Sequence, residues 1–258
     1  MKFIILTLFP EMFESFLNTS ILKRAIGKNL IEVKLVNIRD FTKDKYGRVD
    51  TPPIGGGAGL IMKCQPIIDS LNASCTNATH KIILAPRGKQ FNQAKAIGLS
   101  KEKEILILCG HYEGVDERVY KYFDESISIG DFILTGGETA AFCLIDSISR
   151  LIPGVISESS TVEESFTNSL LEYPQYTEPF DYKNDSVPLL LYSGNHIAIN
   201  KYHKKMSISL TKQYRPDLFA NYTFTKEDKK LLDELKTDAT PKWEQDAIEK
   251  GKKFTKNH

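Results

Sequence analysis

Four short segments of this chain combine glycine with charged or polar residues, two of them directly after apolar runs. They are 55–59 (GGGAG), 85–89 (APRGK), 109–118 (CGHYEGVDER) and 128–138 (SIGDFILTGGE). Glycine lets a ligand approach the backbone closely, and backbone amides at such turns hydrogen-bond phosphates and nucleobase edges. Ligands bind open α/β sheets at the carboxyl ends of the strands. Together the segments predict a pocket for an adenosine-sized ligand.

Taken one at a time, these segments allow plainer interpretations. The glycines at 55–59 lack the Lys-Ser/Thr pair of a P-loop, so a flexible loop explains them as well as a phosphate cradle does. Segment 85–89 is equally weak alone. Asp116 and Glu117 suit the first turn of a helix, which favours a structural role for both.

The elements that must position these segments follow a regular order. Apolar runs at 2–9, 82–85 and 105–109 predict strands, and so does the alternation of apolar and polar residues at 31–36. A helical pattern at 91–99 separates the last two runs. This β-α-β rhythm predicts an α/β fold with a mostly parallel sheet and helices packed on its faces.

The second half of the chain changes character. A helix is predicted from Glu138 to Leu151, with one apolar face. Residues 157–169 are rich in Ser, Thr and Glu and predict a linker or mobile loop. After Pro174 the chain is predicted to be helical and locally basic, with a helix at 224–236 capped by Thr225 and a frayed polar end.

Composition limits the class of protein. The chain has 258 residues, 41% apolar and 26% charged, which is ordinary for a soluble globular protein. The net charge of +1 gives no global basicity, so any nucleic-acid surface must be local. Four scattered cysteines without a C-x-x-C pair argue against a disulfide framework or a structural zinc site. The N-terminal apolar run ends at Pro10 and no run reaches the ~20 residues of a membrane span, so we expect a cytoplasmic protein.

Six strings occur in one order between residue 1 and residue 235: LFPEMF, GGGAG, GHYEGVDERV, SIGDFILTGGE, DSISRLIPGV and SGNH. In this combination the chain closely resembles the bacterial tRNA (guanine-N1)-methyltransferases of the SPOUT superfamily. The resemblance implies transfer of a methyl group from S-adenosylmethionine to N1 of guanine 37 in tRNA, beside the anticodon. It also implies a deep trefoil knot and a homodimer whose active sites use residues of both chains.

The same resemblance implies a division of the chain and a set of cofactor contacts. It gives a knotted S-adenosylmethionine-binding domain at 1–158, a flexible linker at 159–173 and a helical tRNA-binding domain at 174–258. It brings Mg²⁺ as a further cofactor, although the five histidines have no metal-binding spacing. The residues that match the family's cofactor-binding loops are Leu84, Pro86, Gly110, Tyr112, Glu113, Gly114, Ser128, Ile129, Gly130, Asp131, Phe132, Ile133, Leu134, Gly136 and Gly137.

The reaction itself needs a base and a hydrogen-bond donor. Guanine N1 carries a proton at neutral pH, so methylation requires a base near N1 and a donor or positive group near O6. The family's arginine matches Arg150, and its linker aspartate is replaced here by Glu164 in a linker one residue shorter. We expect Glu164 to be the general base, with Glu163 or Glu113 as the alternatives.

Two further features concern charge. His111 stands where relatives carry arginine, and an imidazole is largely uncharged at pH 7, so a cationic role at this position is in doubt. Residues 195–215 contain no acidic side chain and match the region expected to contact tRNA, with a solvated charged helix as the plainer alternative. The predicted phosphate contacts are Lys201, Lys204, Lys205 and Arg215.

Other functions are weighed against this one. One alternative is another SPOUT enzyme that acts on a ribose 2′-hydroxyl or a ribosomal RNA base. It would share the fold, but it would leave the carboxylates of the linker and the SGNH string without a function. A catalytically inactive RNA-binding relative is compatible with the change from aspartate to Glu164. A Rossmann dehydrogenase is disfavoured because no G-x-G-x-x-G follows the first strand.

Overall fold

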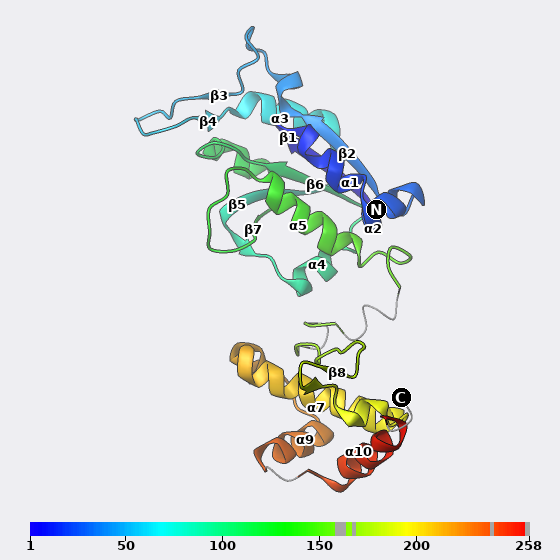
Figure 1. Ribbon diagram of the computed structural model, residues 1–258. Helices are drawn as coiled ribbons and strands as arrows, with labels where there is room; N and C mark the ends of the chain where they lie inside the picture. Colours follow the sequence, from blue (N-terminus) through cyan, green and yellow to red (C-terminus); the bar gives the residue numbers. More distant parts are fainter. Residues whose placement is uncertain (158–163, 167–168, 238–239, 256–258) are drawn as a thin grey trace. The chain divides into compact units, whose positions relative to one another are not determined.

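The chain forms two compact units, residues 1–158 and 159–258, each with its own hydrophobic core (Figure 1). The computed structural model describes residues 1–157, 164–166, 169–237 and 240–255. Part of the predicted linker, together with Glu163, therefore lies outside the described residues.

The first unit is an α/β structure. Its strands are β1 (Lys2–Thr7), β2 (Glu32–Asn37), β3 (Asp50–Thr51), β4 (Ile61–Met62), β5 (His80–Gln90), β6 (Glu104–Cys109) and β7 (Glu125–Ser128). Its α-helices are α1 (Phe13–Leu17), α2 (Ser20–Gly27), α3 (Cys64–Ser74), α4 (Gln93–Leu99) and α5 (Glu138–Ser149). Short 3-10 helices lie at η1 (Pro10–Met12), η2 (Ile38–Phe41) and η3 (Glu117–Tyr122). The predicted strands and helices of this half are confirmed, apart from shifts at their ends.

The central sheet has five strands in the order β2-β1-β6-β5-β7, and every pair is parallel. The predicted mostly parallel sheet is therefore confirmed. β3 and β4 form a separate antiparallel ribbon, and the glycines at 55–59 lie in the loop between them.

Helices cover both faces of this sheet because successive side chains of a strand point to opposite sides. On β1, Phe3 and Ile5 join a core with α1, α2, α4 and α5. Ile4 and Leu6 join a second core with α3, η2 and η3. All four side chains are fully buried, as expected for a parallel strand covered on both sides.

β5 continues beyond its predicted end at Ala85 through a bulge. Leu84 and Lys89 both pair with Ile127 of β7, so the residues between them are displaced from the ladder. A Cβ at Gly88 would lie 2.5 Å from the Ile127 backbone, which requires glycine there. The bulge brings Pro86 to the end of the sheet where β6 and β7 also finish.

The second unit is mainly helical from Leu189 onwards. Its helices are η4 (Leu189–Tyr192), α7 (His196–Tyr214), α8 (Pro216–Asn221), α9 (Lys226–Lys236) and α10 (Lys242–Thr255). The predicted cap of α9 is confirmed: the Thr225 hydroxyl accepts the Asp228 N–H at 3.1 Å, and the Asp228 carboxylate accepts the Thr225 N–H at 2.9 Å.

Two expectations for this unit were wrong. Residues 174–188 are not helical; they are largely irregular, with a short ribbon of β8 (Asp181–Tyr182) and β9 (Asp185–Ser186). Three prolines in this stretch remove backbone donors and disfavour helix. The described part of the C-terminus is not frayed either, because α10 buries Ala247 and packs Gly251 against the carbonyl of Leu189. Because Ala247 and Gly251 are small, α10 and η4 approach closely even though the sequence of α10 is largely polar.

Candidate active site

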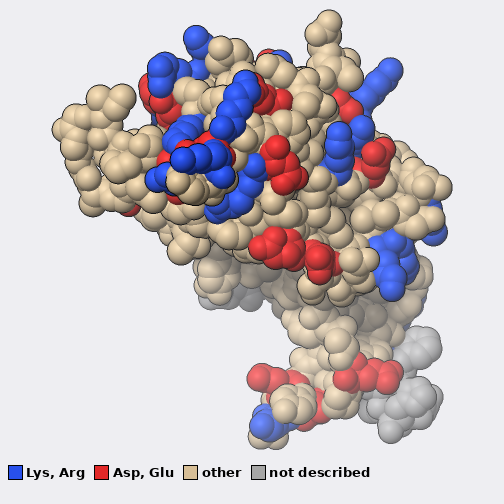
Figure 2. All heavy atoms as spheres, turned by 90° about the horizontal axis from the view of Figure 1, so that it is seen from above, with Lys and Arg blue, Asp and Glu red and all other residues tan. Residues whose placement is uncertain are grey.

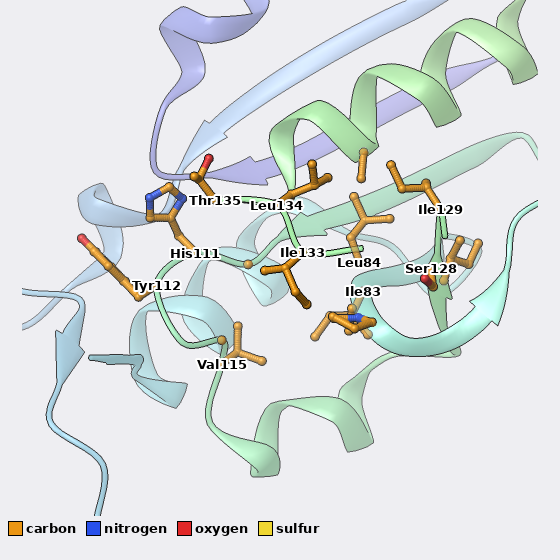
Figure 3. A pocket seen from close by; sticks show the side chains of 18 of the residues that line it. Ile83, Leu84, His111, Tyr112, Val115, Ser128, Ile129, Ile133, Leu134 and Thr135 are labelled. Atoms are coloured by element: carbon orange, nitrogen blue, oxygen red, sulfur yellow. The ribbon is translucent and has the colours of Figure 1, made fainter. Parts of the chain in front are cut away.

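A cavity of about 300 Å³ lies at the carboxyl ends of β6 and β7, beside the bulge of β5 (Figure 3). Its walls are the bulge of β5, the loop that follows β6, and the segment from β7 to α5. This is the edge at which open parallel sheets bind ligands. The position of the cavity follows from the parallel topology, since the ends of β6 and β7 and the bulge of β5 lie at the same edge of the sheet.

The structure brings the predicted cofactor-binding residues together around this cavity, with one exception. All of them line it except Asp131, which is exposed and is not among the lining residues. The cavity is lined by further residues that were not named individually: Ala85, His111, Val115 and Thr135 lie within the predicted glycine-bearing segments, whereas Ile83, Tyr120, Ile127 and Ala140 lie outside them. Most are neighbours of predicted residues, whereas Tyr120 belongs to η3 and reaches the cavity only through the tertiary fold.

The loop after β6 is held in shape by the ribbon of β3 and β4. The Glu113 N–H donates to the Leu60 carbonyl at 3.0 Å, and the Met62 N–H donates to the Gly114 carbonyl at 3.0 Å. Tyr112 adopts a left-handed backbone with φ of 60°. The glycines at 55–59 do not line the cavity; a Cβ at Gly59 would collide with the Glu113 side chain. Gly59 therefore lies against this loop.

The segment between β7 and α5 supplies backbone groups and an apolar wall. The Ser128 hydroxyl and the Gly130 backbone are hydrogen-bonded to each other. Ile133 is 82% exposed although it lines the cavity, so a ligand seated there would cover apolar surface. The Gly137 N–H donates to the Gly110 carbonyl at 2.8 Å, which joins this segment to the loop after β6.

A charged cluster braces the outer side of the cavity. The Arg87 guanidinium stacks 3.3 Å from the Tyr120 ring centroid and donates to both carboxylate oxygens of Glu117. Asp116 accepts the Arg118 N–H at 2.9 Å and caps η3, so its predicted structural role is confirmed. Hydrogen bonds from the Arg118 guanidinium hold the pKa of Asp116 well below its ordinary value.

The two predicted catalytic residues lie on different units. Arg150 is the C-cap residue of α5 in the first unit. Glu164 belongs to the second unit and precedes a turn in which the Phe166 N–H donates to the Leu170 carbonyl at 2.9 Å. The Ser165 hydroxyl accepts the Glu172 N–H at 2.9 Å and braces the same turn. Both predicted roles stay predictions.

The predicted phosphate contacts are engaged inside the second unit. Lys201 lies 3.5 Å from Glu234, and Lys204 donates to the Tyr222 hydroxyl at 2.8 Å. Two hydrogen bonds join Arg215 to Asp217. Lys205 is only 8% exposed and its ammonium lies 2.6 Å from the Glu244 carboxylate. For Lys205 the structure favours a structural role over phosphate contact, because its charge is buried and paired.

Replacing Lys205 by methionine is expected to destabilise the second unit by about 3 kcal/mol, because the loss of one partner leaves a buried carboxylate unpaired. Thermal and urea unfolding of the full chain measure this. Lys212→Met, at an exposed position of the same helix, is the matched control and is expected to change stability by less than about 0.5 kcal/mol. Unchanged stability of Lys205→Met with a flatter salt dependence of tRNA binding would favour phosphate contact instead.

Within the part of the chain that the structure describes, no three His, Cys, Asp or Glu side chains gather closely enough to hold a metal ion. In the same residues no helix combines the length and apolarity needed to cross a bilayer. On the face seen in Figure 2, Lys and Arg lie interspersed with Asp and Glu.

Comparison with known proteins adds independent information. The family described as tRNA (Guanine-1)-methyltransferase TrmD matches residues 1–221. The tRNA (guanine-N(1)-)-methyltransferase of Clostridium botulinum (strain Eklund 17B / Type B) is 56% identical over 234 residues, covering 90% of this chain and 98% of the relative. The proteins of the same name from Clostridium novyi (strain NT) and Clostridium tetani (strain Massachusetts / E88) are 56% and 54% identical, covering 90% and 88% of this chain and 97% and 96% of each relative. The chain therefore belongs to the tRNA (guanine-1)-methyltransferase family.

Proposed function

We propose that this protein transfers a methyl group from S-adenosylmethionine to N1 of guanine 37 in tRNA, next to the anticodon. The observation that carries the proposal is the cavity at the carboxyl ends of β6 and β7 and the bulge of β5, lined by the segments that match the family's cofactor-binding loops. Family membership over 1–221 supports the same reaction.

The cavity suits the adenosine part of the methyl donor. Gly130, Gly136 and Gly137 carry no side chain that would keep an adenine edge away from the backbone, and Leu84 and Ile133 supply apolar surface. S-adenosylmethionine supplies an electrophilic methyl group on a sulfonium sulfur. Mg²⁺ is kept as a proposed cofactor without assigned ligands.

The chemistry assigned to the protein is proton removal and charge stabilisation. In our proposal the Glu164 carboxylate accepts the N1 proton of the target guanine, and the N1 electron pair forms the bond to the methyl carbon as the carbon–sulfur bond breaks. Arg150 donates to guanine O6, where negative charge builds as the proton leaves. The target base must leave its stack to reach the cavity.

The proposal extends to the architecture that this reaction uses in the family. It includes a trefoil knot, supported by the close passage of Gly137 beside Cys109 and Gly110, where a Cβ would lie 2.7 Å from the Cys109 Cα. It also includes a homodimer with shared active sites, and tRNA binding by residues 174–258, in which the helices begin at Leu189. Because the proposed substrate is tRNA, the proposed location of the protein is the cytoplasm.

The test is nucleoside mass spectrometry of an in vitro tRNA transcript with guanine at position 37, after incubation with purified protein and S-adenosylmethionine. We expect 1-methylguanosine from this transcript and none from a matched transcript with adenine at 37. A ribose-methylated product, or product only from ribosomal RNA, would assign another SPOUT activity. Donor binding by calorimetry without any transfer would identify an inactive RNA-binding relative.

A further inference from the structure

His111 has a buried ring nitrogen that makes no hydrogen bond. Within the described residues, its Nδ1 and the Ser149 hydroxyl are the buried side-chain polar atoms that lack a partner. The nearest carboxylate oxygen, Glu138 Oε2, lies 3.8 Å from Nδ1, beyond the ~3.2 Å limit of an N–H···O bond. Buried polar atoms in proteins are nearly always hydrogen-bonded, so this almost-formed contact requires an explanation.

Glu138 is a fixed acceptor. It is the first residue of α5 and is 1% exposed. The Thr7 hydroxyl, at the end of β1, donates to its Oε1 at 2.8 Å. The N-terminus of a helix favours a carboxylate at this position. Oε2 therefore presents a stationary target, and the imidazole is the group whose movement would complete the bond.

The His111 ring lies where the two principal walls of the cavity meet. His111 forms a backbone bridge with Gly136, and a Cβ at Gly136 would collide with both Nδ1 of His111 and Oε2 of Glu138. The ring packs 4.9 Å from Phe9 and 5.0 Å from Tyr112, measured between centroids. Figure 3 shows His111 and Tyr112 at one end of the cavity, with Ser128 and Ile129 towards the other. A contact between His111 and Glu138 thus links the loop after β6 to the start of α5.

We propose that His111 is a positioning residue for the methyl donor. When the donor fills the cavity, His111 Nδ1–H donates to Glu138 Oε2 and holds the loop 110–114 against the turn 134–137. Hydrogen bonds in ligand-free sites are often long and shorten when the complex forms. The inference rests on the proposed function, because the ligand that closes the cavity is taken to be S-adenosylmethionine. It requires no positive charge on the imidazole, only the tautomer that carries hydrogen on Nδ1.

The two ring nitrogens of His111 can be tested separately with amides. The amide nitrogen of asparagine occupies the place of Nδ1, whereas that of glutamine reaches the place of Nε2. We expect His111→Ala and His111→Gln to weaken S-adenosylmethionine binding in calorimetry about tenfold or more, since a hydrogen bond to a charged group contributes ~1.5–3 kcal/mol. His111→Asn is expected to stay within about threefold of the wild type. The donor KM should rise in parallel, with kcat at saturating donor much less affected.

Several outcomes would overturn the inference. Equal weakening in His111→Asn and His111→Ala, unchanged donor affinity in His111→Ala, or an effect confined to kcat would each do so. Thermal melting of the ligand-free variants distinguishes positioning of the donor from a purely structural role of His111. A purely structural role would lower the melting temperature of the asparagine and glutamine variants alike. If the wild-type protein binds no donor, the proposed function fails; if it binds and transfers normally while His111→Ala matches it, only this inference fails.

Discussion

Glu164→Gln is expected to slow methyl transfer at saturating donor and tRNA by at least ~100-fold, because glutamine keeps the shape of the side chain but cannot accept the N1 proton. Single-turnover transfer to a guanine-37 transcript measures this rate. Binding of S-adenosylmethionine should be unchanged, since Glu164 is not among the residues that line the cavity. The structure holds the adjoining turn with hydrogen bonds at Ser165 and Phe166, so the variant is expected to keep its fold.

Two parallel variants make this assignment testable. Glu163→Gln replaces the neighbouring acid, and Glu113→Gln replaces an acid that lines the cavity. Near-normal transfer by Glu164→Gln, together with a large loss in one of the other two, would move the general base to that residue. Loss of transfer in Glu164→Gln with donor affinity intact would support Glu164.

Gly137→Ala is expected to have the other large effect. Its added Cβ would lie 2.7 Å from the Cys109 Cα and 3.0 Å from the Gly110 nitrogen, and neither backbone atom can move aside cheaply. Overpacking of this kind costs about 1–3 kcal/mol. It would also push the turn 134–137 away from the loop after β6, so we expect a lower melting temperature and at least tenfold weaker donor binding. Differential scanning calorimetry and isothermal titration measure the two effects.

Gly98→Ala is the matched control for this change. Gly98 lies inside α4 and no atom lies within 4 Å of its added Cβ. Alanine is favoured over glycine in a helix by roughly 0.5–1 kcal/mol, so the control is expected to be as stable as the wild type or more so. If Gly137→Ala kept the stability and donor affinity of the wild type, the packing of Gly137 against Cys109 and Gly110 would be looser than these distances indicate.

Much of the site was predictable because it is formed by short segments whose residue pattern is visible in the sequence. The apolar run before Gly110 predicted where β6 ends, and the run before Pro86 predicted where the regular pairing of β5 breaks into a bulge; in a parallel sheet both points lie at one edge. The cavity at that edge collects the predicted residues other than Asp131. The cap at Thr225 was also predictable, since a capping box involves only the N-cap residue and the residue three positions later.

The failures of prediction share a different cause. The fit of Gly251 against Leu189 and the pairing of Lys205 with Glu244 both join residues far apart in the chain, so composition pointed to a frayed end and an exposed basic face. The glycines at 55–59 were compatible with either a phosphate-binding loop or a flexible loop, and they do not line the cavity; Gly59 lies against the Glu113 side chain. The pattern of neighbouring residues in the sequence does not predict contacts between residues that are far apart in the chain.

The amino-acid sequence by itself determined the parallel α/β class of the first unit, the order of its elements and the glycine-bearing turns that form the cavity. These depend on hydrophobic periodicity and backbone freedom, which act over a few residues. Only the tertiary structure decided that Thr7 holds Glu138 across 131 positions and that His111 stops just short of the same carboxylate. Such contacts depend on how the strands and α5 are packed, because hydrogen bonds and steric limits act over a few ångströms of space whatever the distance along the chain.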